Sequence, residues 1–427
     1  MHLVAAALAI LALARCDTGT EADRATGSVA TLTVWFHSGQ PGERETIEAQ
    51  VSRFNASQQD VRVQLTILPE RSYNAQVQSA AVAGELPDLL EFDGPYLYRY
   101  VWQGELVPLD DLLDPEIRAD LLPTIVAQGT FAGKLYSVGT FDSGLALYAR
   151  RSRLEEVGVR IPASPAAAWT VEEFEAALAA LARADGDGAV LDLKLNYPGE
   201  WLTYAFSPVI QSAGGDLIER DRHQSASGVL NGPAARKALR HVQTWFEKGF
   251  VDPNVDDAAF TGGRVTLSWV GHWEFSRYDA HVGNDLALVP LPDFGTGTKT
   301  GQGSWNWGVT TSCRQPEQAV RFLEFLLRPE EVLAMANANG AVPATRAAIG
   351  RSPLYGKGGP LRLFVDQLAG GFAVPRPRTP AYPVITSAFQ RAFLDIRHGT
   401  DVGAALDKAV AAIDRDIEDN RGYPFGG

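Results

Sequence analysis

The length, charge and cysteine content of the chain restrict the kind of protein it encodes. Its 427 residues predict two or three compact units rather than one. With 51 acidic against 38 basic residues, the formal net charge is −13, which disfavours nucleic-acid binding. Apolar residues make up 45% and charged residues 21%, as in folded soluble proteins. Two cysteines exclude a disulfide framework and a zinc cluster built from cysteine pairs.

The first 28 residues predict export. Residues 3–14 are an apolar run of 12, whereas a membrane-spanning helix needs about 20. Such a run followed by Cys16 is typical of a signal peptide (1–16) that ends in a lipoprotein cysteine, and the polar segment 17–28 is typical of a flexible tether. Arg15 stands where such sites usually carry Gly or Ala, and no Lys or Arg precedes the run. The alternative is an N-terminal helix buried in the fold.

Strand and helix patterns alternate from residue 31 onward. Strands are predicted at 31–36, 61–67 and 86–92, and helices at 43–55 and 72–83, the second ending at Gly84. This order predicts an α/β fold with a largely parallel sheet. The loop 93–96 follows the C-terminal end of a strand, where open α/β sheets bind ligands.

The remainder of the chain continues the mixed pattern. In residues 136–148, two apolar runs flank a glycine-containing turn, which indicates a crossover between two lobes. Thr170 and Glu173 predict a capping box that opens a helix. Further helices are predicted near 239–246, at 316–327 and over 406–417, and strands at 286–291 and 305–311.

Six short segments carry a more specific signal. They are TLTVWFHSG (31–39), residues 84–113, residues 133–159, GGRVTLSWVGHWEF (262–275), GQGSWNWGVT (301–310) and NGAVPATRAA (339–348). In this order they resemble the extracellular solute-binding proteins of ABC importers, specifically the large carbohydrate-binding family related to maltose-binding protein. The resemblance spans residues 30–427.

The resemblance implies a two-lobe periplasmic-binding-protein type II fold, in which each lobe is a mostly parallel sheet flanked by helices and a hinge joins the lobes. Residues 29–141 and 286–342 would form the N-terminal lobe, and residues 142–285 and 343–427 the C-terminal lobe. Such a protein performs no chemistry. It is an exported monomer that clamps a small carbohydrate between its lobes and delivers it to the permease subunits.

A sugar site combines aromatic rings, which pack on the C–H face of the sugar, with polar groups that bond its hydroxyls. The strongest candidate is Trp273, at the place where the family presents a stacking aromatic, with Glu274 and His272 beside it. Other candidates follow a strand end or a crossover, or lie where the family lines its cleft. They are His37, Ser38, Asp93, Gly94, Tyr96, Phe141, Asp142, Trp201, Tyr204, Trp305, Asn306, Arg376 and Arg378.

Each candidate has a structural alternative. Trp273, Trp201 and Tyr204 would then be packed aromatics, Asp93 and Asp142 turn or cap residues, and Arg376 and Arg378 solvated side chains. Because side chains alternate along a strand, at least one of Trp305 and Trp307 is expected in the core, and Trp305 is assigned to the cleft.

Several chemistries lack their motifs. The seven histidines show no HxxxH or HExxH pairing, and Asp185 and Asp187 lack the third ligand of a calcium loop, so no metal site or cofactor is predicted and residues 185–188 are interpreted as a helix-ending turn. Two alternatives to sugar capture remain: a glycerol-phosphate or glycerophosphodiester-binding protein of the same family, and a secreted glycosidase that uses Asp93 with Asp142 or Glu274.

Overall fold

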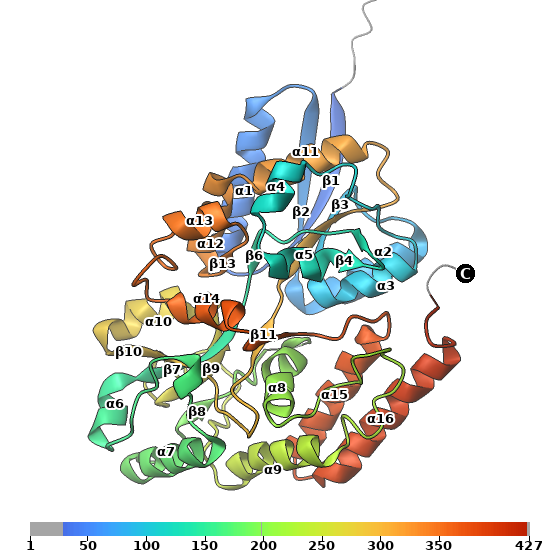
Figure 1. Ribbon diagram of the computed structural model, residues 1–427. Coiled ribbons are helices and arrows are strands. Elements are labelled where there is room, and N and C mark those ends of the chain that lie inside the picture. Colours follow the sequence, from blue (N-terminus) through green and yellow to red (C-terminus); the bar gives the residue numbers. More distant parts are fainter. Residues whose placement is uncertain (1–28, 198, 425–427) are drawn as a thin grey trace, which may run out of the picture.

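The computed structural model describes residues 29–197 and 199–424, and the predicted signal peptide, Cys16 and tether lie outside this range. Two four-stranded sheets organise the chain, with strand orders β12-β3-β1-β2 and β10-β7-β9-β8. Helices flank each sheet, so that two α/β lobes lie one above the other (Figure 1). We refer to the elements around the first sheet as the first lobe and to those around the second sheet as the second lobe.

The first lobe is built from the start of the chain and a later return. Its strands are β1 (Ala30–His37), β2 (Val61–Leu68), β3 (Leu89–Asp93) and β12 (Trp305–Val309), with a hairpin of β4 (Thr130–Phe131) and β5 (Lys134–Leu135). Its helices are α1 (Pro41–Ser57), α2 (Tyr73–Ala83), α3 (Leu97–Trp102), α4 (Pro115–Asp120), α5 (Pro123–Gly129), α11 (Pro316–Leu326) and α12 (Pro329–Asn339). Strands β1, β2 and β3 are parallel, and β12 is antiparallel to β3.

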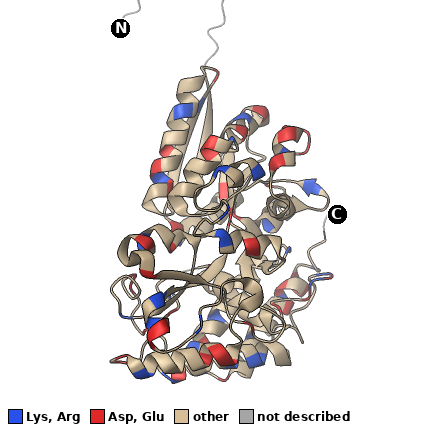
Figure 2. Ribbon diagram, turned by 60° about the vertical axis from the view of Figure 1, so that its left-hand side comes forward, with Lys and Arg blue, Asp and Glu red and all other residues tan. Residues whose placement is uncertain are grey.

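The second lobe contains most of the middle and the end of the chain. Its strands are β7 (Leu145–Arg150), β8 (Leu191–Asp192), β9 (Leu267–Gly271) and β10 (Leu286–Val289). Its helices are α6 (Arg151–Glu156), α7 (Val171–Ala184), α8 (Trp201–Ser212), α9 (Pro233–Glu247), α10 (Phe275–Val282), α15 (Tyr382–Arg397) and α16 (Val402–Asp419). Charged residues of both signs are interspersed over the helices of the two lobes (Figure 2).

Short paired strands join the lobes. Strand β6 (Phe141–Asp142) pairs with β13 (Val342–Pro343), and β11 (Thr300–Gln302) pairs with β14 (Ala373–Pro375). Helices α13 (Arg346–Arg351) and α14 (Arg362–Ala369) lie between β13 and β14 along the chain. The chain therefore crosses between the lobes as paired extended segments, which restrict the directions in which the lobes can move.

The predicted lobe boundary at residue 286 differs from the observed pairing. Strand β10 hydrogen-bonds to β7 of the second sheet, and Ala287 and Val289 belong to the second hydrophobic core. Burial of these side chains holds the segment in the second lobe, and the chain rejoins the first sheet at β12. The rest of the predicted division stays a prediction.

Local sequence signals fix several element ends. Helix α2 ends before Gly84, whose φ of 69° is the left-handed conformation that glycine adopts at little cost. Helix α7 ends at Ala184, and the Asp185 carboxylate then accepts bonds from the backbone N–H groups of Asp187 and Gly188. This confirms that the segment is a helix-ending turn.

The last helix shows how the sequence pattern becomes packing. In α16 the residues Leu406, Val410, Ile413 and Ile417 are buried in the second core, at the spacing that places them on one helix face. The two lobes have separate hydrophobic cores, and Trp245 and Trp269 are buried in the second. Within the described residues, no helix is long and apolar enough to cross a membrane.

The predicted capping box is present and its contribution can be measured. The Thr170 hydroxyl accepts from the Glu173 backbone N–H at 3.2 Å, and the Glu173 carboxylate accepts from the Thr170 N–H at 2.9 Å. Thr170→Ala is expected to lower the free energy of unfolding by about 1 kcal/mol, because the first helical turn loses an acceptor. Urea unfolding measures the change. Thr244→Ala, which removes a hydroxyl bonded only within α9, is the control, and an equal effect of both variants would contradict the prediction.

Candidate functional site

The first-lobe candidates gather at one edge of its sheet. His37 ends β1 and Asp93 ends β3, and these parallel strands point in the same direction. Trp305 begins the antiparallel strand β12 directly opposite Asp93. The C-terminal edge of the parallel strands therefore carries all three, which is the edge where α/β sheets bind ligands.

The second lobe presents an aromatic wall. Strand β9 ends at Gly271, and Trp273 follows in a 3₁₀ turn. The Trp273 ring meets Trp201 edge-on at 5.9 Å between centroids and lies 6.3 Å from Tyr204. Trp201 and Tyr204 are buried, whereas Trp273 is half-buried and keeps part of its ring accessible. We call Trp201, Tyr204 and Trp273 the aromatic wall.

Gly271 allows the Trp273 ring to lie where it does. A Cβ atom on Gly271 would stand 2.1 Å from the Trp273 ring, which is closer than atoms can approach. The ring therefore packs directly on the Gly271 backbone. Any side chain at this position would displace Trp273 from the aromatic wall.

Arg376 connects the two lobes. Its Nη1 and Nη2 donate to the two carboxylate oxygens of Asp93 at 3.0 and 2.9 Å, and Nη1 also donates to Glu200 at 3.0 Å. Asp93 belongs to the first lobe, and Glu200 is the N-cap of α8 in the second. The guanidinium lies over the Tyr204 ring at 4.9 Å, so the carboxylates and the aromatic wall are in continuous contact.

Glu200 is a carboxylate of this network that sequence reasoning missed, and its two partners on α15 were missed as well. Its carboxylate also accepts from the hydroxyls of Tyr382 and Thr386, both on α15. These partners lie more than 170 residues away along the chain, and no local pattern indicates them. We call Asp93, Glu200 and Arg376, with Tyr382 and Thr386, the interlobe network.

The ionisation of Glu200 gives the fold a pH dependence. Burial raises the pKa of Glu200 from 4.5 to about 7, and Asp93 adds to the rise while Arg376 opposes it. The native state then binds this proton more tightly than the unfolded chain does, so the contribution of Glu200 to stability is full below about pH 4.5 and is lost as the pH rises through 7.

Unfolding measured across this pH range tests the assignment. As the pH rises from about 4.5 to about 7, the unfolding free energy of the wild-type protein is expected to fall relative to that of Glu200→Gln, by up to about 1.4 kcal/mol per pH unit. The glutamine variant cannot titrate at this position and should lack that component of the slope. A difference that stays constant or shifts in favour of the wild type would contradict the raised pKa.

Phe141 and Asp142 lie at the crossing rather than on an open surface. Phe141 is buried, and one Asp142 oxygen accepts from the backbone N–H groups of Ser143 and Gly303 at 2.8 and 3.1 Å. Burial raises the pKa of Asp142 above its usual range. The structure thus shows Asp142 holding two crossing segments together.

Gly94, Tyr96 and Asn306 also occupy interior positions. A Cβ on Gly94 would approach the Asn306 amide nitrogen to 2.6 Å, so only glycine fits there. Asn306 donates to the Gln128 side chain at 2.9 Å. Tyr96 meets the Tyr382 ring edge-on at 5.9 Å, next to the interlobe network.

The remaining candidates differ in their surroundings. The Ser38 hydroxyl accepts from the Glu70 backbone N–H at 3.2 Å, and His37 is buried and paired with Glu91. Trp307 is buried in the first core, as expected for one of the two tryptophans, and Trp305 is half-buried. Arg378 is half-buried and takes part in none of the hydrogen bonds or ion pairs found between residues 29 and 424, with 198 set aside.

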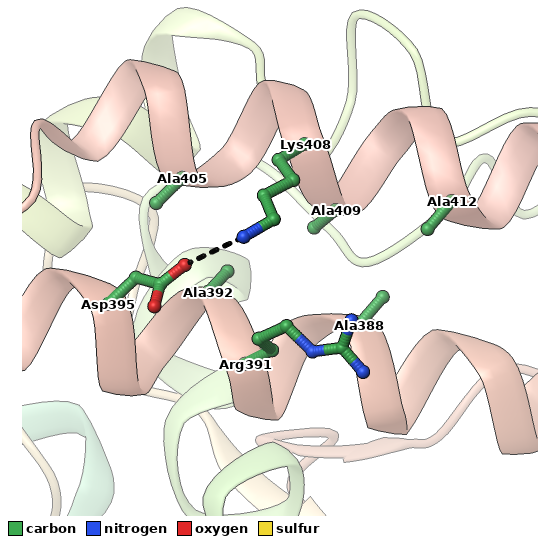
Figure 3. Close-up of a pocket in the computed structure, with 8 residues that line it drawn as sticks. All are labelled: Ala388, Arg391, Ala392, Asp395, Ala405, Lys408, Ala409 and Ala412. Carbon is green, nitrogen blue, oxygen red and sulfur yellow. Dashed lines mark ion pairs between the residues drawn. The ribbon is translucent and has the colours of Figure 1, made fainter.

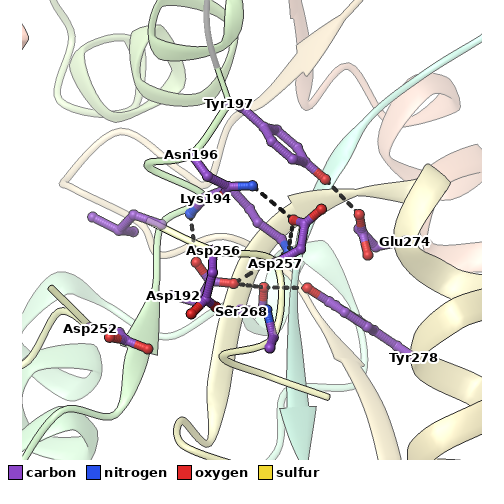
Figure 4. Close-up of polar contacts among 12 residues, drawn as sticks. Asp192, Lys194, Asn196, Tyr197, Asp252, Asp256, Asp257, Ser268, Glu274 and Tyr278 are labelled. Atoms are coloured by element: carbon purple, nitrogen blue, oxygen red, sulfur yellow. Dashed lines mark hydrogen bonds and ion pairs between the residues drawn. The ribbon is translucent and has the colours of Figure 1, made fainter. Parts of the chain in front are cut away.

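A partly buried polar cluster around Glu274 (Figure 4) lies beside the aromatic wall, and its Tyr197 ring meets Trp201 edge-on at 5.3 Å. The Tyr197 hydroxyl donates to one Glu274 oxygen, and Arg277 Nε donates to the other at 2.7 Å. Fully buried Lys194 pairs with Asp257 at 3.1 Å. Glu274 is therefore fixed by two donors, and its neighbour Trp273 is held by the same turn.

Two cavities in the described part of the chain lie away from this region. One, of about 40 Å³, lies between the packed helices α15 and α16. Alanine side chains and the ion pair of Lys408 with Asp395 line it (Figure 3). The other, of about 540 Å³, is a depression on the second lobe beside Arg150 and Thr266.

Between residues 29 and 424, 198 excepted, no group of three or more His, Cys, Asp or Glu side chains is arranged to hold a metal.

Comparisons with known proteins identify the family. The chain is 24% identical to an uncharacterized lipoprotein of Streptomyces antibioticus (81% of this chain, 76% of that protein) and 24% identical to the maltodextrin-binding protein MdxE of Bacillus subtilis (81% and 80%). Its fold matches the GacH receptor of Streptomyces glaucescens at a TM-score of 0.77 and 21% identity (92% and 99%). It also matches maltose-bound MalE3 of T. maritima at 0.77 and 20% (90% and 99%). The model of the bacterial extracellular solute-binding protein family matches residues 49–354, and the chain belongs to this family.

Proposed function

We propose that the protein is the substrate-binding subunit of an ABC importer and captures an uncharged sugar between its lobes. The observation that carries the proposal is the continuous chain of contacts from the half-buried Trp273 through the buried Tyr204 and Arg376 to Asp93 at the junction of the lobes. An aromatic face and fixed carboxylates are the two kinds of group that a sugar needs. The names of MdxE and of the structural neighbours point to the same ligand class.

Closure of the lobes is part of the proposal. Arg376 reaches carboxylates of both lobes, and His272 Nδ1 lies 3.0 Å from the backbone carbonyl of Asn339 at the end of α12. These contacts between the lobes can form only when the lobes are close together. A sugar that bridges Asp93 and the aromatic wall would therefore favour the closed arrangement by binding it more tightly than the open one.

The electrostatics favour an uncharged ligand over a phosphate. Arg376 faces two carboxylates, so its charge is already matched within the interlobe network. A phosphate group needs an unpaired cation or a free helix N-terminus, and among the candidate residues only Arg378 is such a cation, whereas Arg376, which contacts the aromatic wall, is paired. The glycosidase alternative is disfavoured because the family consists of binding proteins.

Delivery completes the proposed role. Cys16 would carry a lipid anchor on the outer side of the cytoplasmic membrane, residues 17–28 would act as the tether, and the monomeric protein would hand its sugar to the permease subunits. The name of the Streptomyces antibioticus relative, a lipoprotein, supports the anchor. Incorporation of a radiolabelled fatty acid into the wild-type chain and not into Cys16→Ala would test it.

A thermal-shift screen tests the ligand class. The protein is heated with mono-, di- and trisaccharides, polyols and glycerophosphodiesters, and hits are checked for turnover by a reducing-sugar assay. A ligand that binds only the folded state raises the melting temperature. We expect a shift with one group of neutral sugars and no turnover. A shift with phosphodiesters alone would support the phosphate alternative, and release of reducing sugar would support the glycosidase.

A further inference from the structure

A histidine lies against the hidden face of the first-lobe tryptophan. The His37 and Trp305 rings are stacked with 3.7 Å between centroids and 7° between planes. Tyr73 meets the same Trp305 ring edge-on at 5.4 Å. His37 is only 3% exposed, whereas Trp305 is half-buried, so the imidazole supports the indole from within the lobe.

Glu91 fixes the imidazole in place. One Glu91 oxygen lies 2.6 Å from His37 Nδ1 and also accepts the His37 backbone N–H at 3.2 Å. Glu91 is itself 1% exposed in the middle of β3, and its backbone carbonyl accepts from the Tyr73 hydroxyl. Strands β1, β3 and β12 and helix α2 thus converge on one small cluster, which we call the indole support: His37, Glu91, Tyr73 and Trp305.

We infer that His37, held by Glu91 and stacked on Trp305, is a positioning residue that fixes the Trp305 indole as the first-lobe wall of the sugar site. The inference rests on the proposed sugar-binding function. It adds His37 as a residue that affects sugar binding only through Trp305. A flat ring already held in its binding orientation loses little freedom when a sugar packs on it. A cation against one face of an indole is a favourable contact in its own right.

The charge of His37 follows from its neighbours. Burial lowers the pKa of His37, but the carboxylate of Glu91 on β3 raises it more, with smaller contributions from Glu43 on α1 and Glu70 after β2, and the pKa rises from 6.5 to about 9. Burial also raises the pKa of Glu91, and His37 opposes that rise; the raised pKa of His37 and the 2.6 Å contact together favour an ion pair at neutral pH. Its stabilising contribution is full below about pH 6.5 and is lost as the pH rises through 9.

Tryptophan fluorescence tests the stack without a ligand. A protonated imidazole in contact with an indole quenches its emission, so emission of the wild-type protein should rise between about pH 8 and about pH 10. His37→Gln and Trp305→Phe should each abolish this step. His281→Gln, which changes an exposed histidine on α10, should keep it. A step that persists in His37→Gln or is missing from the wild type would overturn the contact of a charged His37 with Trp305.

Sugar affinity tests the positioning role. Maltotriose, mannotriose and tagatose are titrated by calorimetry at about pH 7 and about pH 10. For a sugar that binds, wild-type affinity should fall about 3-fold or more at the higher pH, and the affinity of His37→Gln should be lower at neutral pH and vary less with pH. His37→Gln leaves Glu91 without its cation. The double variant His37→Gln/Glu91→Gln replaces both residues by an uncharged pair, and its sugar affinity should also be lower at neutral pH and vary less with pH.

The outcomes separate this role from the proposed function. A pH-independent wild-type affinity, alongside an intact fluorescence step, would overturn the positioning role while sugar binding stands. Binding of no sugar by any variant, alongside the same step, would overturn the sugar assignment and the role together but leave the ion pair and the stack in place.

Discussion

Arg376→Gln is expected to lower the free energy of unfolding by about 3–5 kcal/mol, because it leaves Asp93 and Glu200 largely buried without their cation. The side chain of Arg376 is 5% exposed and those of Asp93 and Glu200 are 11% and 13% exposed, so water cannot replace the lost charge. Glutamine keeps a donor but loses the bidentate geometry. Guanidinium unfolding at neutral pH measures the effect.

Arg378→Gln is the matched control, two residues along the same loop and outside the interlobe network. It is expected to change the unfolding free energy by less than about 0.5 kcal/mol. A similar loss in both variants would mean that the loop itself, rather than the network, is sensitive. A small loss in Arg376→Gln would show that solvent or another donor satisfies the two carboxylates.

The alternating strand and helix order could be predicted from the sequence because its causes are local. Strand β1 and helix α1 follow from the spacing of a few apolar residues, and Gly84 ends α2 through its own backbone freedom. The pairing of β10 with β7 could not be predicted in this way. An apolar strand of four residues fits either sheet, and its place is decided by the core that its side chains fill.

The same distinction applies to the candidate site. Trp273 and Asp93 could be proposed because each follows a strand end, which is a local property. Glu200 and Glu91 could not, since their roles depend on partners in distant segments. The sequence predicts Arg376 as a site residue, and the structure shows that its two carboxylate partners make it a link between the lobes.

Asn306 and Asp142 illustrate how a polar residue can fit the chemistry of a ligand and still serve the fold. Both stand beside the predicted cleft and are almost fully buried, and one polar atom of each is hydrogen-bonded inside the protein. A second polar atom of each, Asp142 Oδ2 and Asn306 Oδ1, has no hydrogen-bond partner among the described residues, although buried polar atoms are normally bonded. The residue type and its position in the sequence do not reveal whether a polar side chain bonds within the fold or to a ligand.

Trp273→Ala is expected to weaken sugar binding by about 2 kcal/mol or more, because it removes the accessible face of the aromatic wall. Phe246→Ala is the control: this half-buried aromatic lies on α9 and packs against Phe393, in a different part of the second lobe. Calorimetry with the sugar that gives the largest thermal shift measures both. Circular dichroism confirms that each variant is folded. If Trp273→Ala binds as the wild type does, the aromatic wall is a packing feature and the sugar must lie against Trp305 and the first lobe instead.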